Sequence, residues 1–122
     1  MIPETTVLLV DDEEDLLRAS TLWLSSAGFA TSTARDGCEA VAHATAHRPN
    51  AIVMDVRMPH KNGLAALAEL KRQEETKHIP VIMLSASLVD QERALDVGAT
   101  CFLSKPYEGR KLVSVVTSAT RS

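Results

Sequence analysis

The sequence predicts an α/β fold, a doubly wound parallel sheet of five strands with five helices packed on its faces. Short apolar runs alternate along the chain with longer stretches whose apolar residues recur at helical spacing. Three of these runs, residues 7–10, 51–54 and 81–84, are apolar throughout. Continuous apolar runs are typical of parallel strands that are buried on both faces.

The first of these strands is followed by a predicted helix. The residues assigned to the apolar face of that helix are Leu16, Ala19, Trp23 and Ala27. Gly28 closes the helix, and the partly polar residues 29–34 are expected to form the second strand. Asp36 can cap the second helix, with Glu39 three residues later, and Pro49 ends that segment.

The middle of the chain is predicted to contain the third strand, residues 51–54, then a helix and the fourth strand, residues 81–84. Asn62 and Gly63 open this third helix, because asparagine is a good N-cap residue. The apolar side of the helix is formed by Leu64, Leu67 and Leu70.

The last part of the chain is predicted to add two helices and one strand. Ser87 can cap the fourth helix, with Asp90 at the matching position, and Gly98 lies at its far end. The few apolar residues of this helix are Val89, Ala94 and Val97. Residues 100–104 form the fifth strand, and Pro106 precedes the fifth helix. The apolar residues of the fifth helix are Leu112, Val115, Val116 and Ala119.

The character of the strands also predicts their order. The first, third and fourth strands are the apolar ones and are assigned to the centre, whereas the more polar second and fifth strands suit the edges. With right-handed crossovers this gives the order 2-1-3-4-5, numbered along the chain. In that order the switch point lies between the first and third strands, where open α/β sheets bind ligands.

Composition restricts the class of protein. A length of 122 residues fits a single domain, taken as residues 1–122 with a core from about residue 5 to 119. The formal net charge of −3 offers no electrostatic basis for nucleic-acid binding. No apolar run is long enough to cross a bilayer, and no secretory pattern is present, so no membrane association is expected. Cys38 and Cys101 both fall inside predicted elements, which favours a reducing, cytoplasmic location.

Polar side chains stand at the carboxyl ends of the predicted strands. These are Asp11 and Asp12 after the first strand, Asp55 after the third, Ser85 after the fourth and Lys105 after the fifth. The three carboxylates belong to the strands at the switch point and are expected to share one crevice. Clustered carboxylates repel unless a cation neutralises them, and Mg²⁺ prefers oxygen ligands. With an ammonium group and a hydroxyl beside it, a carboxylate nucleophile there can take a phosphoryl group.

These residues resemble the receiver domain of two-component response regulators. The resemblance covers nearly the whole chain, from about residue 7 to residue 119. The matching segments are Asp11-Asp12, Met54-Asp55-Val56-Arg57-Met58-Pro59 with Asn62-Gly63, Ser85-Ala86, and Phe102-Leu103-Ser104-Lys105-Pro106. Their order and spacing carry the resemblance, rather than any one segment. It implies the flavodoxin-like receiver fold, whose strand order is the one predicted above.

The resemblance implies a role for each site residue. Asp55 is the phosphoacceptor, which takes a phosphoryl group from a phosphohistidine on a sensor histidine kinase or a histidine phosphotransfer protein. Asp12 and Asp55 ligate Mg²⁺, which Mn²⁺ can replace, with Asp11 acting mostly through water. The backbone carbonyl of Arg57 is a further metal ligand. Lys105 binds the phosphoryl group, next to a cis peptide bond to the following proline.

The resemblance also implies a conformational switch. Ser85 follows the phosphoryl group inward on activation, and Phe102 buries itself in the vacated space. This changes the surface of the fourth helix, fifth strand and fifth helix, where effectors of the family usually bind and a phosphorylation-dependent homodimer can form. The domain is expected to be a signalling module and not an enzyme, although it catalyses its own phosphoryl transfer and dephosphorylation.

Two other functions stay open from the residues alone. An aspartyl-phosphate phosphatase or phosphotransferase would also use Asp55 as nucleophile, but usually has a second aspartate where this chain has Arg57. A flavodoxin-like binding domain would need a phosphate-binding loop after the first strand, where this chain has two repelling carboxylates. Three positions depart from the commonest receiver pattern. They are Ser85 in place of threonine, Asn62 in place of aspartate, and Phe102 where tyrosine is also common.

Overall fold

The computed structural model describes residues 4–121, which form five strands and five helices in strict alternation. The strands are β1 (Thr6–Val10), β2 (Ala30–Ala34), β3 (Ala51–Asp55), β4 (Val81–Ser85) and β5 (Cys101–Ser104). The helices are α1 (Glu14–Ser26), α2 (Gly37–His47), α3 (Gly63–Arg72), α4 (Leu88–Val97) and α5 (Gly109–Thr120). Residues 1–3 and 122 of the predicted domain lie outside the described residues.

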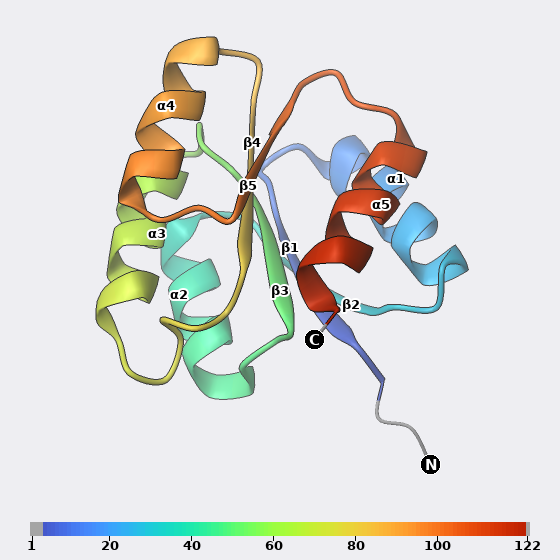
Figure 1. The fold of residues 1–122 in the computed structure, drawn as a ribbon, viewed down its shortest axis with the longest axis horizontal. Helices are drawn as coiled ribbons and strands as arrows, with labels where there is room; N and C mark the ends of the chain where they lie inside the picture. The colour runs from blue at the N-terminus through green and yellow to red at the C-terminus, as the bar shows by residue number, and fades with distance from the viewer. Residues whose placement is uncertain (1–3, 122) are drawn as a thin grey trace.

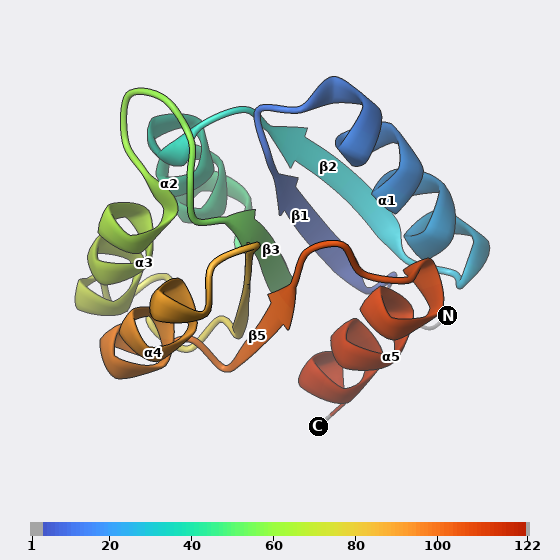
Figure 2. The same ribbon diagram turned by 90° about the horizontal axis from the view of Figure 1, so that it is seen from above.

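The strands form one parallel sheet in the predicted order, β2-β1-β3-β4-β5. Helices α1 and α5 cover one face of the sheet, and α2, α3 and α4 cover the other (Figure 1). Figure 2 shows the same two groups of helices from above, on opposite sides of the sheet. Because β1 and β3 continue into helices on opposite faces, the segments that follow these strands diverge and leave a crevice between them.

The burial of the strands explains this order. Every residue of β3 and β4 is buried, and β1 is buried after its first residue. Both β2 and β5 keep several partly or fully exposed residues. A strand that is apolar throughout needs cover on both faces, so the three apolar strands occupy the centre of the sheet.

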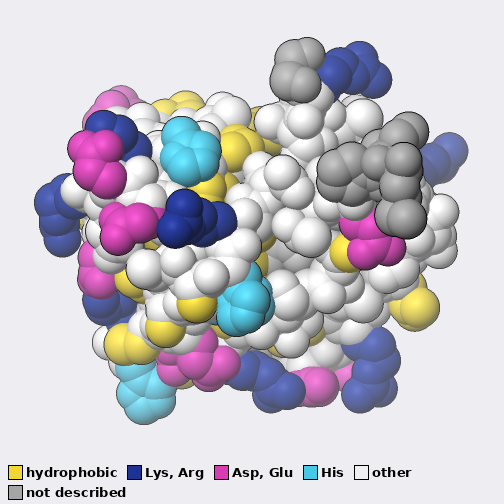
Figure 3. Space-filling model, turned by 90° about the horizontal axis from the view of Figure 1, so that it is seen from below, with side chains coloured by type: hydrophobic (Ala, Val, Ile, Leu, Met, Phe, Trp, Pro, Cys, Tyr) yellow, Lys and Arg dark blue, Asp and Glu magenta, His cyan; other side chains and the backbone are white. Residues whose placement is uncertain are grey.

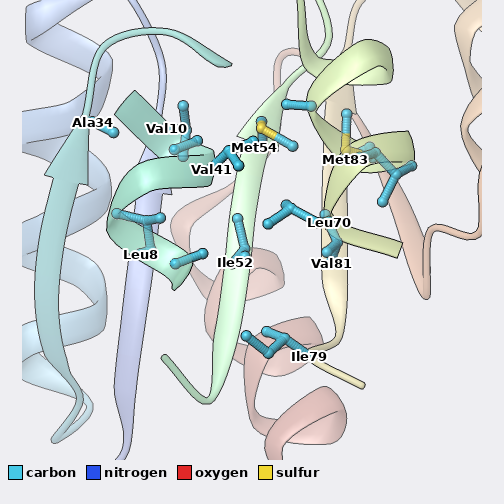
Figure 4. Close-up of a cluster of buried hydrophobic side chains, with 14 of the residues drawn as sticks. Leu8, Val10, Ala34, Val41, Ile52, Met54, Leu70, Ile79, Val81 and Met83 are labelled. Carbon is cyan, nitrogen blue, oxygen red and sulfur yellow. The ribbon is translucent and has the colours of Figure 1, made fainter. Parts of the chain in front are cut away.

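Alternate residues of the central strands contribute to two separate cores. On the side of α2, α3 and α4, Leu8, Ile52 and Val81 pack with Val41 and Leu70 (Figure 4). The buried residues on the other side are Val7, Leu9, Leu17, Leu24, Val53, Ile82, Leu84, Leu103, Leu112 and Val116. Close-packed cores on both faces fix the positions of the strand ends.

The predicted starts of two helices are confirmed. The side chains of Asp36 and Asn62 each accept a hydrogen bond at 2.9 Å from the backbone N–H three residues later. These bonds satisfy N–H groups that have no partner inside the helix. At the other ends, Gly28 and Gly98 follow α1 and α4 with φ angles of 97° and 123°, which glycine adopts most readily.

The face of α1 that packs on the sheet differs from the prediction. The buried residues of α1 are Leu17, Ser20 and Leu24. Three residues of the predicted face, Ala19, Trp23 and Ala27, are exposed instead. A polar residue can occupy the buried stripe because the hydroxyls of Ser20 and Tyr107 lie 3.0 Å apart and form a hydrogen bond. Trp23 lies toward α5, where a methyl group added to Gly109 would come within 1.9 Å of its ring.

Helix α4 departs from the prediction at its cap and at its face. Ser87 occupies the N-cap position, but its side chain makes no capping hydrogen bond. Asp90 is buried and accepts hydrogen bonds from side chains outside the helix. Of the three apolar residues expected there, only Ala94 is buried, whereas Val89 is 59% and Val97 is 36% exposed. One small side chain and one buried carboxylate therefore attach α4 to the rest of the fold.

The lower end of the molecule, away from the crevice, has a mixed polar surface. Figure 3 shows basic and acidic side chains there, interspersed with histidines. Two histidines of α2, His43 and His47, stack with their ring centroids 4.4 Å apart. The hydroxyl of Ser32 lies 3.0 Å from Nε2 of His43 and ties α2 to the edge strand β2.

We predict that Gly63 tolerates no side chain. A Cβ atom there would lie 2.2 Å from the carbonyl oxygen of Asp55 and 2.9 Å from Cε of Met83. Because a backbone carbonyl cannot yield cheaply, Gly63→Ala should lower the free energy of unfolding by about 3 kcal/mol, a high cost for overpacking. Urea denaturation measures this. The control Ala65→Gly, at an exposed position of the same helix, should lose only about 1 kcal/mol, and equal losses would contradict the close approach.

Candidate functional site

The sheet brings the predicted site side chains together at one end of the molecule. Asp55 ends β3, Ser85 ends β4, and the other groups follow β1 and β5. One carboxylate oxygen from each of Asp11, Asp12 and Asp55 lies within 4.8 Å of the others. An open cleft is lined by Asp12, Asp55, Ser85 and Lys105, together with the loop after β4.

Lys105 lies between two of the carboxylates. Its Nζ donates hydrogen bonds to Oδ2 of Asp11 at 3.2 Å and to Oδ2 of Asp55 at 3.0 Å. The backbone N–H of Lys105 donates to the carbonyl oxygen of Ser85 at 3.0 Å, which fixes its place beside β4. The peptide bond between Lys105 and Pro106 is cis, as the resemblance implied.

Burial makes charge on this cluster costly. Asp11 and Asp55 are only 3% and 5% exposed. Burial raises the pKa of the Asp55 carboxyl, although the hydrogen bond from Lys105 opposes that shift. Burial also raises the pKa of Asp11, and the charge of Asp55 adds to the effect. Burial lowers the pKa of Lys105, but the two carboxylates outweigh it and the pKa of Lys105 is raised. The ammonium group alone does not neutralise the cluster.

The donor set fits a hard divalent cation. The three carboxylate oxygens lie close enough to share one ion, and oxygen ligands are what Mg²⁺ prefers. Asp12 is exposed while the other two carboxylates are buried, so the cluster opens to solvent on the side of Asp12. An open side suits an ion that keeps several of its waters. Arg57, whose backbone carbonyl was expected to be a ligand, lines the same cleft.

Asp90, which was expected at a capping position of α4, contacts two residues that line this cleft. Its carboxylate accepts a hydrogen bond from Oγ of Ser85 at 2.7 Å. It also accepts two from the guanidinium of Arg57, from Nε at 3.1 Å and from Nη2 at 3.3 Å. Oγ of Ser85 in turn accepts a bond from the backbone N–H of Ser87 at 3.1 Å. The hydroxyl proton of Ser85 is therefore directed to Asp90 in this conformation.

Phe102 lies on β5 in register with Met83 of β4. Its ring is partly exposed and packs against the core on the side of α2, α3 and α4. The neighbouring helix α4 exposes Leu88 and Val89, at 73% and 59%. β5 and the neighbouring helix α4 thus both leave apolar side chains partly or largely exposed.

Other features of the described residues add little to the site. Cys38 and Cys101 are free thiols. Within residues 4–121, no helix has the length and apolar character that crossing a membrane requires.

The chain is similar to known proteins over almost its whole length. Residues 7–117 match the family described as the response regulator receiver domain. The chain is 39% identical over 117 residues to the transcriptional regulatory protein PrrA of Mycobacterium leprae, which covers 94% of this chain and 49% of PrrA. It therefore spans about half the length of that relative. It is 32% identical over 115 residues to the polar-differentiation response regulator DivK of Brucella anthropi, covering 93% of this chain and 94% of DivK.

A solved structure agrees with this similarity. The receiver domain of the sensor histidine kinase PA1611 from Pseudomonas aeruginosa PAO1 has a TM-score of 0.91 and 30% sequence identity. The match covers 98% of this chain and 100% of that one. In that structure a magnesium ion is coordinated in the active site cleft. The predicted fold class is confirmed by the strand order and by this match.

We predict that Asp55→Asn stabilises the protein at neutral pH when divalent cations are removed. Because burial raises the folded-state pKa of Asp55, its contribution to stability is fully present below the unfolded pKa and is lost as pH rises through the folded pKa. Asparagine does not ionise, so the gain in thermal midpoint should be clear at about pH 7 and vanish near pH 3. Thermal unfolding in EDTA measures it, with the exposed Asp96→Asn as control. An unchanged midpoint at neutral pH would contradict burial as the dominant cause.

Proposed function

The chain belongs to the response regulator receiver domain family, and we propose that it accepts a phosphoryl group on Asp55 and relays that event as a change of surface. One observation carries the proposal: the Asp55 carboxylate lies 3.0 Å from Nζ of Lys105 and beside two further carboxylates. A structural loop gains nothing from clustered carboxylates, and burial raises the pKa of two of them, Asp11 and Asp55. Phosphoryl transfer, in contrast, needs a nucleophile, a cation site and a positive group in one place.

In the proposed reaction, an Oδ atom of Asp55 attacks the phosphorus of a phosphohistidine on a sensor histidine kinase or a histidine phosphotransfer protein. A P–O bond forms while the P–N bond breaks, and the electron pair of the P–N bond stays on the imidazole nitrogen. The products are an aspartyl phosphate on this chain and a histidine on the donor. The ammonium of Lys105 pairs with a phosphoryl oxygen and stabilises the charge that the transferred group carries.

The cation is proposed to be Mg²⁺, with Mn²⁺ as a substitute because it also prefers oxygen ligands. Asp12 and Asp55 would hold it directly, Asp11 mostly through water, and the backbone carbonyl of Arg57 would complete the protein ligands. When bound, the ion supplies positive charge for the carboxylates and the phosphoryl oxygens. The magnesium ion in the cleft of the PA1611 receiver domain supports this assignment.

The wider function proposed is that of a cytoplasmic signalling module, in which residues 1–122 form one domain. It would act on no external substrate, and its catalysis would be limited to its own phosphorylation and dephosphorylation. With a net charge of −3, it is not proposed to bind nucleic acid directly. A phosphorylation-dependent homodimer is proposed as one use of the changed surface.

We predict that acetyl phosphate with Mg²⁺ adds one phosphoryl group to the wild-type protein and none to Asp55→Asn, which lacks the nucleophilic carboxylate. Mass spectrometry of the intact protein measures the gain. Asp96→Asn removes an exposed carboxylate of α4 and should label like wild type. Labelling should stop in EDTA. Equal labelling of Asp55→Asn would remove Asp55 from the proposed role.

The signal is proposed to leave through α4, β5 and α5. Only Asp90 and Ala94 of α4 are buried, so this helix is weakly attached to the sheet. Segments with few buried contacts open at low free-energy cost and supply the mobile parts of switches. Phe102, on the neighbouring strand, is partly exposed and has apolar area left to bury.

Phosphorylation of Asp55 is predicted to change amide hydrogen exchange most in residues 85–105 and to leave residues 28–46 nearly unchanged. Exchange measured by mass spectrometry tests this. Phe102→Ala should still be phosphorylated but should show a smaller change in α4, because the burial of the ring is lost. Phe29→Ala, at the chain's other phenylalanine, is the control and should respond like wild type. Changes concentrated in α2 would contradict the proposed route.

A further inference from the structure

We propose that Asp90 is a positioning residue that sets how readily this domain adopts its phosphorylated conformation. It would do so by competing with the phosphoryl group for the hydroxyl proton of Ser85. The role rests on the function proposed for Asp55. Asp90 lies in the first turn of α4 and does not line the cleft beside Asp55 that the site residues share.

The competition follows from the chemistry of a serine hydroxyl, which has one proton to donate. In this conformation the proton goes to Oδ2 of Asp90, at an oxygen–oxygen distance of 2.7 Å. To bond a phosphoryl oxygen on Asp55, Ser85 must first give up that bond. Both acceptors are anionic, so the two hydrogen bonds are of similar strength and a modest change at Asp90 shifts the balance.

Because Asp90 is buried, moving the Ser85 hydrogen bond from Asp90 to the phosphoryl group costs free energy. The carboxylate of Asp90 is only 2% exposed, and its remaining partner after the loss of Ser85 is Arg57. The Arg57 side chain is 70% exposed and lies on the solvent side of this pair. A buried carboxylate that loses one of three hydrogen-bond donors is destabilised, because water cannot easily replace the missing donor. This cost opposes the phosphorylated conformation.

The same contacts connect α4 to the phosphorylation site. The backbone N–H of Arg57 donates to Oδ1 of Asp55 at 3.4 Å, while its guanidinium holds Asp90. Asp90 is also one of the two buried residues of α4. Release of Ser85 therefore weakens one of the two attachments of this helix, which is the element proposed to carry the signal.

The test uses beryllofluoride with Mg²⁺ as a mimic of the phosphoryl group, and isothermal titration calorimetry to measure its dissociation constant. Asp90→Asn keeps the size of the side chain but makes it a weaker, neutral acceptor. We expect it to bind beryllofluoride about threefold to tenfold more tightly than wild type. Asp96→Asn, an exposed change of the same kind on the same helix, should bind like wild type.

A double-mutant cycle with Ser85→Ala separates this role from a structural one. Without the hydroxyl there is no shared proton, so Asp90→Asn should no longer change the affinity in the Ser85→Ala background. A structural effect of Asp90 on the fold would give the same ratio in both backgrounds and would overturn the inference. If Asp90→Asn does not fold, Asp90→Ala carries the same comparison.

The outcomes for the two proposals differ. If wild type binds beryllofluoride and Asp90→Asn binds equally or less tightly, the role of Asp90 is wrong while the function proposed for Asp55 stands. If wild type does not bind beryllofluoride in the presence of Mg²⁺, the proposed function fails and the role of Asp90 fails with it.

Discussion

The repulsion among three carboxylates is the constraint on which the rest of this structure depends. Asp11, Asp12 and Asp55 keep an oxygen each within 4.8 Å of the others, and two of them are buried. Side chains on mobile loops would separate to lower this energy. Here Asp11 and Asp12 follow β1 and Asp55 ends β3, and alternate residues of both strands are fixed in two close-packed cores. The free energy of those cores holds charges together that would otherwise move apart, and the result is a site with a high affinity for positive charge.

The elements that carry the site residues are not equally buried, and this difference determines which part of the domain moves most easily. The acidic half of the site lies on β1 and β3, in the centre of the sheet. The groups proposed to contact the phosphoryl group, Ser85 and Lys105, lie at the ends of β4 and β5. Burial is lower in β5 and in α4, the elements beside them, than in the central strands. Asp55 therefore lies between a rigid part of the fold, β1 and β3, and a less tightly packed part, β5 and α4. Motion is cheapest on the looser side, because fewer buried contacts must be broken there.

The fold could be predicted because its signals are local. Apolar runs, caps such as Asp36 and Asn62, and polar residues at strand ends identify the strands, the helix starts and the crevice from short segments alone. The errors came from pairs distant in sequence. The buried face of α1 includes Ser20, whose hydroxyl is satisfied by Tyr107, 87 residues away. Asp90 fitted a local capping rule, but its carboxylate pairs with Arg57, 33 residues away. Sequence patterns indicate the local interactions that a residue can make, but they do not identify its hydrogen-bond partners from distant parts of the chain.

Asp90 also illustrates a difference between two properties of a receiver domain. The family motif determines the chemistry of the site, but it determines the equilibrium between the two conformations less closely. In the proposed function, the acidic cluster and Lys105 allow a phosphoryl group to be accepted. How far the accepted group shifts the conformational equilibrium depends on which interactions are lost when one conformation changes into the other. In this chain one such loss is the hydrogen bond between Ser85 and a carboxylate that is 2% exposed. That carboxylate also binds Arg57 and attaches α4 to the rest of the fold. Its contacts therefore link the position of the Ser85 hydroxyl proton to the attachment of α4. On this proposal, a residue outside the motif sets the strength of the switch without touching the phosphoryl group.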